Sequence, residues 1–447
     1  MTYEQAKNVL ASHDQAHVLQ FWGQLNDSQK EALLRQIEVL DFSSITRMQA
    51  LLKNAQSKVS SSSPFEPAPV ENPTGAELET CVAEGEKLLK EGKVAVLLVA
   101  GGQGSRLGYD GPKGAYPIGP ITHNSLFWFH ARKVLGLSQT YGVHIPFYVM
   151  TSESNDAATR AHFESNDYFG LPREDVFFFI QGMWPALTPA GKIILDTPGH
   201  IFMSPDGHGG TLMALNRSGA FDDMENRGIR HIFFFQVDNP MVEIADPAFI
   251  GLHEIRNADM SLKVCRKRDG HEGMGVVVTR NGHYEMVEYS ELTDEQMERI
   301  NPDGSLWLAY GSPAIHVFSY DFLKTEAARA MPIHLAHKKI AMISESGELI
   351  KPEAPNGYKF EKFIFDIIPN AKRLVTFEFE RKNEFSPVKN ATGNDSPATT
   401  QRDLQMKWRT WLEQLEIRVP DTLSIEIDPA YALNAKQLRE HGLRIGC

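Results

Sequence analysis

The stretch of sequence that decides the fold runs from Leu97 to Gly108 and reads LLVAGGQGSRLG. It begins as an apolar run, as expected for a buried β-strand, and continues into Gly101, Gly102 and Gly104. These glycines have no side chain, so backbone N–H groups can approach a ligand closely. A loop at the carboxyl end of a strand is where open α/β sheets bind ligands. We therefore predict a ligand-binding loop here.

The spacing of the glycines and cations narrows the ligand class. The loop does not match G-x-G-x-x-G, and it does not match G-x-x-x-x-G-K-[ST] because Lys113 precedes Gly114. Dinucleotide-binding and P-loop interpretations therefore lose support. Arg106 and Lys113 add two cations, which a polyphosphate needs and a neutral ligand does not. The alternative is a tight strand-to-helix turn with surface charges, but the whole segment favours a polyphosphate site.

Further apolar runs flank this loop and lack the in/out alternation of a half-exposed strand. They are Val94–Ala100, Ile145–Met150, Val176–Ile180 and Ile229–Val237. Such runs are typical of a sheet that helices cover on both faces. The sequence predicts an α/β fold, doubly wound around a mixed sheet, with a crossover helix after Asn124. Four later strand patterns predict antiparallel additions to this sheet, namely Ser261–Lys267, Gly275–Thr279, Tyr284–Tyr289 and Ala314–Tyr320.

The chain is expected to have three regions. A helical N-terminal region with a helix start near Asn26 ends in a connector, Ser57–Gly75, that is rich in serine and proline. The tail contains a strand pattern, Leu374–Glu380, and a helical stretch, Arg402–Leu415. The predicted domains are 1–75, a helical region and linker, 76–372, a catalytic domain, and 373–447, a small C-terminal domain.

Composition restricts the partners and the location. The chain has 447 residues and a formal net charge of -12, which opposes binding to nucleic acid. It has neither an N-terminal leader pattern nor an apolar run long enough to span a membrane. Cys81, Cys265 and Cys447 are odd in number and far apart, so a reducing, cytoplasmic location fits. We expect small-molecule substrates and no nucleic acid or membrane partner.

From the glycine loop onward, the chain resembles the eukaryotic-type UDP-sugar pyrophosphorylases, and within them it is most similar to the enzymes for UDP-N-acetylglucosamine. The resemblance covers residues 75–391. Beyond the glycine loop its blocks are MTS at 150–152, QGMWPAL at 181–187, PDGHGG at 205–210, VDN at 237–239, VEYSE at 287–291, KP at 351–352, PNG at 355–357 and EFSPVKNA at 384–391.

The resemblance implies a nucleotidyltransferase of Rossmann-like, GT-A-like fold that uses Mg²⁺. The implied reaction is UTP plus N-acetylglucosamine 1-phosphate to UDP-N-acetylglucosamine plus pyrophosphate. A sugar-phosphate oxygen would attack the α-phosphorus of UTP. Because that oxygen is already an anion, the protein needs no base and acts by positioning and charge neutralisation.

The family pattern also implies a role for individual residues. The implied catalytic residues are Arg106 and Lys113, and the implied metal ligand is Asp238. The implied nucleotide-binding residues are Gly101, Gly102, Gln181, Gly207 and Lys359. The implied sugar-binding residues are His208, Glu288, Ser312 and Lys389. Taken singly, Asp238 could also cap a turn, and the lysines and Glu288 could be surface charges.

Two positions depart from the acetylglucosamine enzymes. His208 and Ser312 each stand where those enzymes have an asparagine. A UDP-glucose or broad UDP-sugar pyrophosphorylase is therefore an alternative. A glycosyltransferase is another, although it does not need Arg106 and Lys113 on a glycine loop. A third hypothesis is a non-enzymatic, sugar-nucleotide-binding regulatory protein.

Overall fold

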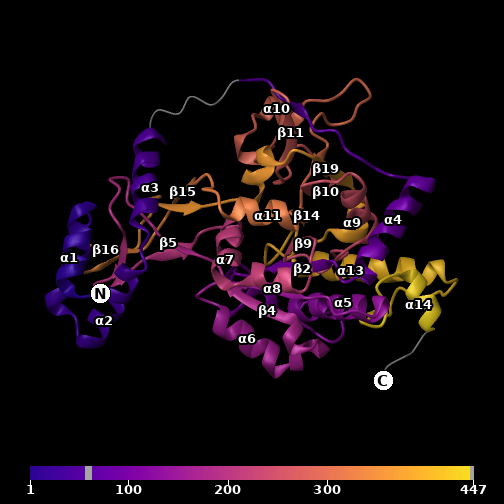
Figure 1. Ribbon diagram of the computed structural model, residues 1–447, viewed down its shortest axis with the longest axis horizontal. Helices are drawn as coiled ribbons and strands as arrows, with labels where there is room; N and C mark the ends of the chain where they lie inside the picture. Colours follow the sequence, from indigo (N-terminus) through magenta and orange to yellow (C-terminus); the bar gives the residue numbers. More distant parts are fainter. Residues whose placement is uncertain (56–62, 443–447) are drawn as a thin grey trace. The chain divides into compact units, whose positions relative to one another are not determined.

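The computed structural model describes residues 1–55 and 63–442 (Figure 1). Positions 57–62 of the predicted connector and Cys447 lie outside the described residues. The chain forms two compact units, and neither is continuous in sequence. Unit 1 comprises Met1–Ser63, Gly182–Gly210 and Met331–Ile364, and unit 2 comprises Pro64–Gln181, Thr211–Ala330 and Phe365–Cys447.

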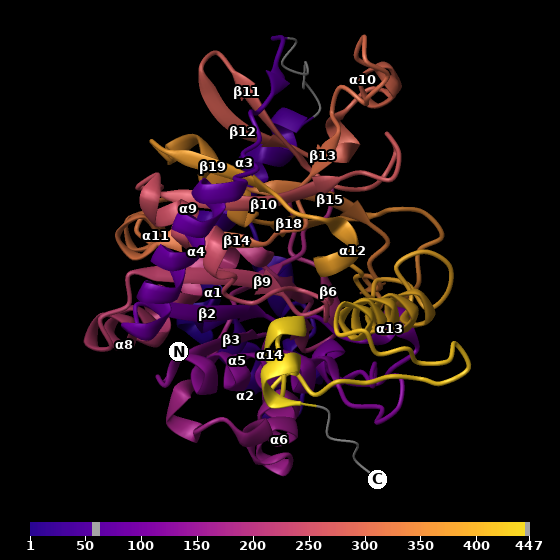
Figure 2. The ribbon, with the colours of Figure 1, turned by 90° about the vertical axis from the view of Figure 1, so that its right-hand side faces the viewer.

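Unit 2 is built on an eight-stranded mixed sheet in the order β13-β10-β14-β9-β2-β3-β4, with β19 beside β10. The strands are β2 Val94–Val99, β3 Phe147–Thr151, β4 Val176–Ile180, β9 His231–Gln236, β10 Met260–Arg266, β13 Tyr310–Gly311, β14 His316–Ser319 and β19 Leu374–Glu378. Figure 2 shows most of them in succession. Strands β4, β3, β2 and β9 are parallel, whereas β14 runs antiparallel to both β9 and β10. The prediction of an α/β fold with a mixed sheet is confirmed.

Helices cover both faces of this sheet. On one face, Val96, Leu98, Phe233 and Phe235 share a core with α4 Gly75–Lys90, α5 Leu126–Tyr141, α9 Pro247–Ile255 and α13 Pro397–Gln414. On the other face, the Tyr148 hydroxyl donates to Asp223 of α8 Ala220–Asn226. The remaining helices of unit 2 are α6 Asp156–Ser165, α7 Thr211–Ser218, α10 Asp294–Glu298, α11 Tyr320–Ala327, α12 Arg381–Glu384 and α14 Ala435–His441.

Helices α4 and α9 lie side by side (Figures 1 and 2). They cross closely at two glycines. A Cβ at Gly251 would lie 1.7 Å from the carbonyl oxygen of Cys81, and a Cβ at Gly85 would lie 1.9 Å from that of Pro247. Any side chain at either position would force the helices apart.

The strands after residue 260 correct part of the prediction. β10 and β14 join the main sheet as expected. β11 Val276–Arg280 and β12 His283–Val287 instead form a separate three-stranded sheet, in which β11 lies between β1 Glu66–Pro67 and β12. The reason is a small core of its own, in which Phe65 and Trp307 cover the valines of β11.

The tail also differs from the predicted C-terminal domain. Strand β19 pairs in parallel with β10 of the main sheet. Leu404 and Trp408 of α13 belong to the main core. The tail therefore completes unit 2 and does not stand alone, because its strand finds a partner at the central sheet.

Unit 1 combines the N-terminal helices with two later segments. Its elements are α1 Tyr3–Ser12, α2 Asp27–Glu38, α3 Phe42–Ala55, β5 Met183–Pro185, β6 Leu195–Thr197, β7 His200–Ile201, β8 Met203–Pro205, β15 His334–Lys338, β16 Met342–Ile343, β17 Leu349–Ile350 and β18 Gly357–Glu361. Helix α2 starts after Asn26, as predicted, and Asn26 also forms a reciprocal capping box with Gln29. The helices share a core with Trp184, Leu187 and Phe360. The predicted boundary at residue 75 did not anticipate these partners.

Two further observations bear on the environment of the chain. No helix among residues 1–55 and 63–442 is long and apolar enough to cross a membrane. Cys81 and Cys265 are both buried and carry free thiols.

Candidate functional site

The topology of unit 2 brings the glycine loop and Asp238 to one edge of the sheet. Strands β2 and β9 are parallel neighbours, with Val99 opposite Gln236. The chain proceeds from β2 outward to β3 and β4 and then returns to β9 on the other side of β2. Ligands in open α/β sheets bind outside the carboxyl ends of the strands at such a reversal. The loop follows β2 and Asp238 follows β9, so both lie at this point.

A buried asparagine holds the glycine loop from behind. The amide of Asn155 donates to the carbonyl oxygens of Ala100 at 2.9 Å and Gly102 at 3.2 Å. Its own oxygen accepts from the backbone N–H of Ser152 at 2.8 Å. Asn155 was not predicted, and its only signal was its position just after the second apolar run, Ile145–Met150.

The two central glycines differ in their surroundings. A Cβ at Gly101 would lie 2.7 Å from Oε1 of Gln181, whereas a Cβ at Gly102 would meet nothing within 4 Å. Gln181 is buried, and its backbone N–H donates to Thr151 at the end of β3. The structure therefore brings Gly101 and Gln181 together and leaves the outer side of Gly102 open.

The two charges nearest the loop face each other. Nζ of Lys113 lies 3.7 Å from Oδ2 of Asp238, and their side chains are only 18% and 13% exposed. Arg106 lies on the exposed turn Ser105–Leu107. The backbone carbonyl of Asp238 accepts from the N–H of Val388 at 2.8 Å, which ties the segment before Lys389 to this edge.

Asp238 is an oxygen ligand of the kind that Mg²⁺ accepts. Magnesium sites commonly use one or two carboxylates and complete the shell with water and substrate phosphates. A single carboxylate beside a loop with open backbone thus fits such a site.

A second acidic group does not fit a metal. Glu243, Asp246 and Glu384 lie close together, but Nζ of Lys263 is 2.7 Å from Asp246 and 2.6 Å from Glu384. Burial opposes the charge of Lys263, yet these carboxylates outweigh it and raise its pKa. The ammonium group already supplies the cation.

The predicted sugar residues of unit 2 gather around Gly275 and the loop after α12. A Cβ at Gly275 would lie 3.1 Å from Oε1 of Glu288. The N–H of Ser312 donates to the carbonyl of Gly275 at 2.9 Å. The N–H of Lys389 donates to the carbonyl of Asp395 at 2.7 Å, and its ammonium lies 5.8 Å from the centre of the Phe385 ring.

The remaining predicted residues lie in unit 1, where the turn at 206–210 packs on β18. The N–H of Ile364 donates to Nδ1 of His208 at 3.1 Å, so Nε2 carries the ring hydrogen. Gly207 has φ of 85°, and a Cβ there would lie 2.4 Å from the carbonyl oxygen of Lys362. Packing therefore explains this glycine. Burial lowers the pKa of Lys359 on β18.

A buried ion pair beside this turn was missed. Nζ of Lys362 lies 3.4 Å from Oδ2 of Asp206, and it also lies 4.2 Å from the centre of the Trp184 ring. Both charged side chains are buried. The sequence showed two lysines in NGYKFEK, and the prediction took only the first.

Comparison with known proteins relates the whole chain to one group of enzymes. A family model described as UTP–glucose-1-phosphate uridylyltransferase, UDPGP, matches residues 41–412. UDP-N-acetylglucosamine pyrophosphorylase of Saccharomyces cerevisiae is 35% identical, over 97% of this chain and 96% of the relative. UDP-N-acetylhexosamine pyrophosphorylase-like protein 1 of Xenopus tropicalis is 37% identical, over 94% and 87%. The crystal structure of the Trypanosoma brucei UDP-N-acetylglucosamine pyrophosphorylase with an inhibitor has a TM-score of 0.84, with 26% identity over 99% of this chain and 95% of that one.

Proposed function

Because the chain belongs to the UDPGP family of uridylyltransferases, we propose that it joins UTP and N-acetylglucosamine 1-phosphate into UDP-N-acetylglucosamine and pyrophosphate. The observation that carries this proposal is the juxtaposition of Lys113 and Asp238 beside the open side of Gly102. The strand order β4-β3-β2-β9 supports a Rossmann-like, GT-A-like fold for unit 2.

In the proposed reaction, an oxygen of the sugar phosphate forms a bond to the α-phosphorus of UTP. The bond from that phosphorus to the bridging oxygen breaks, and its electron pair leaves with pyrophosphate. Lys113 and Arg106 neutralise the charge that grows on the leaving group. The backbone of Gly101 and Gly102 holds the phosphates, and Gln181 reads the uracil edge, because a side-chain amide donates and accepts at once.

We propose Asp238 as the protein ligand of Mg²⁺. The ion would supply positive charge between phosphate oxygens when it is bound. Lys113 and Asp238 form an ion pair in the protein alone. In the proposed complex, Lys113 would bind phosphate and Asp238 would hold the metal ion. Chelator should abolish turnover, and Asp238→Ala should remove most of it while the melting temperature stays unchanged. Full turnover in excess chelator would contradict the proposal.

The roles of the sugar residues come from the family pattern and are assigned for each unit by itself. Glu288 accepts from sugar hydroxyls, Ser312 borders the acetamido group, and Lys389 binds the sugar phosphate. From unit 1, the family pattern gives Gly207 and Lys359 roles toward the nucleotide, and His208 offers a ring N–H to the sugar.

Glucose 1-phosphate is a second candidate substrate. Ser312 has a shorter polar arm than the asparagine of the acetylglucosamine enzymes, and the His208 N–H can serve a hydroxyl as well as an acetyl oxygen. The description of the family model points in the same direction. The two free, buried thiols fit the cytoplasmic location that we propose.

The deciding experiment measures pyrophosphate release by the full chain with UTP and a panel of sugar 1-phosphates. We expect the highest kcat/KM with N-acetylglucosamine 1-phosphate and measurable turnover of glucose 1-phosphate, with a ratio below about 10⁴. CTP and ATP should react poorly, because they leave the polar groups of the base site unpaired. No turnover of the acetylated substrate would make glucose 1-phosphate the leading candidate. No release with any sugar phosphate would favour the binding-protein hypothesis.

A further inference from the structure

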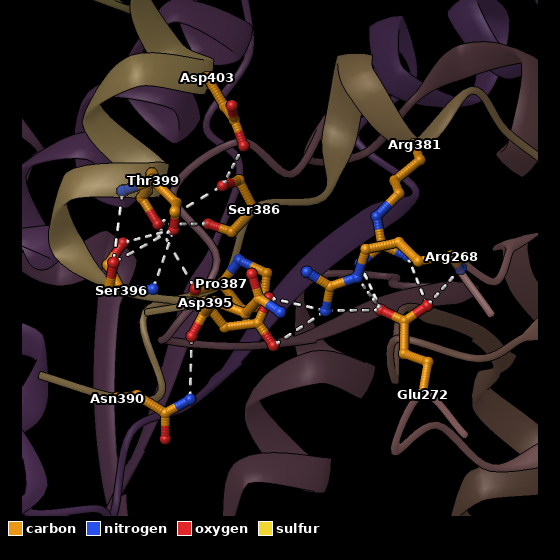
Figure 3. A network of polar contacts seen from close by, with 12 residues as sticks. Arg268, Glu272, Arg381, Ser386, Pro387, Asn390, Asp395, Ser396, Thr399 and Asp403 are labelled. Atoms are coloured by element: carbon orange, nitrogen blue, oxygen red, sulfur yellow. Dashed lines mark hydrogen bonds and ion pairs between the residues drawn. The ribbon is translucent and has the colours of Figure 1, made fainter. Parts of the chain in front are cut away.

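A buried carboxylate outside the proposed set of site residues joins three segments of unit 2. Glu272 lies between β10 and β11, and its side chain is 6% exposed. Arg381 of α12 donates to its two oxygens at 2.6 Å and 3.0 Å. Arg268 donates to it through Nε at 2.9 Å and through its backbone N–H at 2.7 Å. Figure 3 shows the carboxylate held between the two guanidinium groups.

The first connection leads to the predicted sugar contacts. The N–H of Met274 donates to the backbone carbonyl of Glu272 at 2.7 Å. The next residue is Gly275, whose carbonyl binds Ser312 and whose α-carbon faces Glu288. The backbone of Glu272 is therefore connected through Met274 and Gly275 to the wall formed by Glu288 and Ser312.

The second connection leads to Lys389. The guanidinium of Arg268 donates to Oδ1 of Asp395 at 3.1 Å, and the carbonyl of Asp395 accepts from the N–H groups of Lys389 and Asn390. Asp395 has φ of 55°, a strained value that its contacts must maintain. Arg381 also stacks on Phe385, at 4.9 Å from the ring centre, and Lys389 approaches the same ring.

We propose that Glu272 is a positioning residue that fixes the distance between Lys389 and the wall formed by Glu288 and Ser312. This inference rests on the proposed function, because it assumes that both groups contact one sugar 1-phosphate. Paired carboxylate and guanidinium groups have a rigid, bidentate geometry, which suits them to this task. A displacement of 1 Å at a reacting centre can reduce a rate by about 10²-fold.

The charge of Glu272 is maintained in the folded protein. Burial opposes its ionisation, but the backbone N–H of Arg268 and the guanidinium groups of Arg381 and Arg268 lower its pKa. Replacing it with glutamine keeps the shape and removes one negative charge from the network that leads through Arg268 and Asp395 to Lys389. By charge alone, this change would strengthen phosphate binding. If Glu272 acts by positioning, the same change would weaken phosphate binding. The two explanations therefore predict opposite changes in KM for the sugar 1-phosphate.

The test compares steady-state kinetics of the full-length wild type and Glu272→Gln. We expect KM for the sugar 1-phosphate to rise about tenfold or more and KM for UTP to change less than about twofold. The melting temperature should fall, because Arg268 and Arg381 lose the charge of their common partner. Asp395→Asn removes the negative charge that Arg268 binds and leaves Glu272 in place, so it should shift the same constant in the same direction. Asp395→Asn therefore also tests the positioning role if Glu272→Gln fails to fold.

Asp175→Asn is the matched control. Asp175 is a buried carboxylate of the same unit that pairs with Arg227 and His144, and its variant should leave both KM values unchanged. Unchanged or lowered KM for the sugar phosphate in both test variants, or an equal change for UTP, overturns the inference while wild-type turnover preserves the proposed function. If the wild type shows no turnover, both the proposed function and the positioning role of Glu272 are contradicted.

Discussion

Two glycine-rich turns of the molecule differ in the space beside their glycines. In the loop after β2, a Cβ at Gly101 or Gly104 would lie 2.7 or 2.8 Å from Gln181 or Tyr109, but one at Gly102 would meet nothing within 4 Å. In the turn at 206–210, a Cβ at Gly207, Gly209 or Gly210 would lie 2.4, 2.7 or 1.9 Å from Lys362 or Asp206. The first turn leaves space for a molecule that is not part of the protein, whereas the second makes space for the protein's own chain.

The two turns are also anchored differently. Asn155 fixes the first from behind and leaves its outer side open. The second is joined to the end of β18 by backbone hydrogen bonds, from Gly209 to Lys362 and from Lys362 to Asp206. Loss of a charge beside the first turn should therefore reduce activity, whereas side chains at Gly209 or Gly210 of the second turn should mainly reduce stability.

The largest expected effect is on the first turn. Lys113→Ala should lower kcat/KM by about 10²-fold or more, or ~2.7 kcal/mol, because an unpaired negative charge would grow on the leaving pyrophosphate. Pyrophosphate release and thermal unfolding, measured together, should show the loss without a change in melting temperature. Lys87→Ala, in an exposed pair with Glu84, is the control. A loss below threefold would place Lys113 outside the site.

The next effect is on the second turn. Gly210→Ala would place a methyl group 1.9 Å from Oδ1 of Asp206 and should lower the free energy of unfolding by about 2 kcal/mol. Urea unfolding measures it. Gly23→Ala in the same unit, where a Cβ meets nothing within 4 Å, should not destabilise the protein. Equal stability of the two variants would remove the distinction between the turns.

Gly102→Ala sharpens the comparison because it should increase stability while it weakens the binding of UTP. The backbone of Gly102 is outside the left-handed region, so alanine should raise the free energy of unfolding by up to about 1 kcal/mol. The methyl group occupies the space that we assign to UTP, so KM for UTP should rise about tenfold. Stability and kinetics of one preparation test both, and an unchanged KM would refute the assignment.

The smallest effect concerns pH and the strand behind the second turn. Burial lowers the pKa of Lys359, so its positive charge is lost at a lower pH than that of an ordinary lysine. As the pH rises through the pKa of Lys359, the proposed contact between its ammonium group and the phosphates of UTP should weaken. Lys359→Arg keeps its charge and should move the alkaline limb of kcat/KM for UTP to higher pH. Lys192→Arg, on an exposed pair with Asp14, should not move it.

The sequence predicted what local patterns determine. Continuous apolar runs identified β2, β3, β4 and β9, and Asn26 marked the start of α2. The pattern of a strand shows that it is buried but not which edge it joins, which is why β11, β12 and β19 were misplaced. The partners of the N-terminal helices are far away in sequence, so no local signal revealed unit 1.

For the candidate site, the sequence pointed to charged and glycine residues with recognisable spacing. The topology brings Gly101, Lys113, Gln181 and Asp238 to one edge of the sheet, while their roles stay predictions. Asn155 and Glu272 were not predicted, because a buried amide or carboxylate that supports a loop resembles any other polar residue until its partners are known.

The discontinuity of unit 1 has a consequence for synthesis on the ribosome. Helix α2 packs in one core with Phe360, which is made about 300 residues after Leu33, or tens of seconds later at ordinary rates of translation. During that time, the apolar faces of the newly made N-terminal helices lack their final cover. Nascent chains of this protein should therefore be chaperone clients until β18 has left the ribosome.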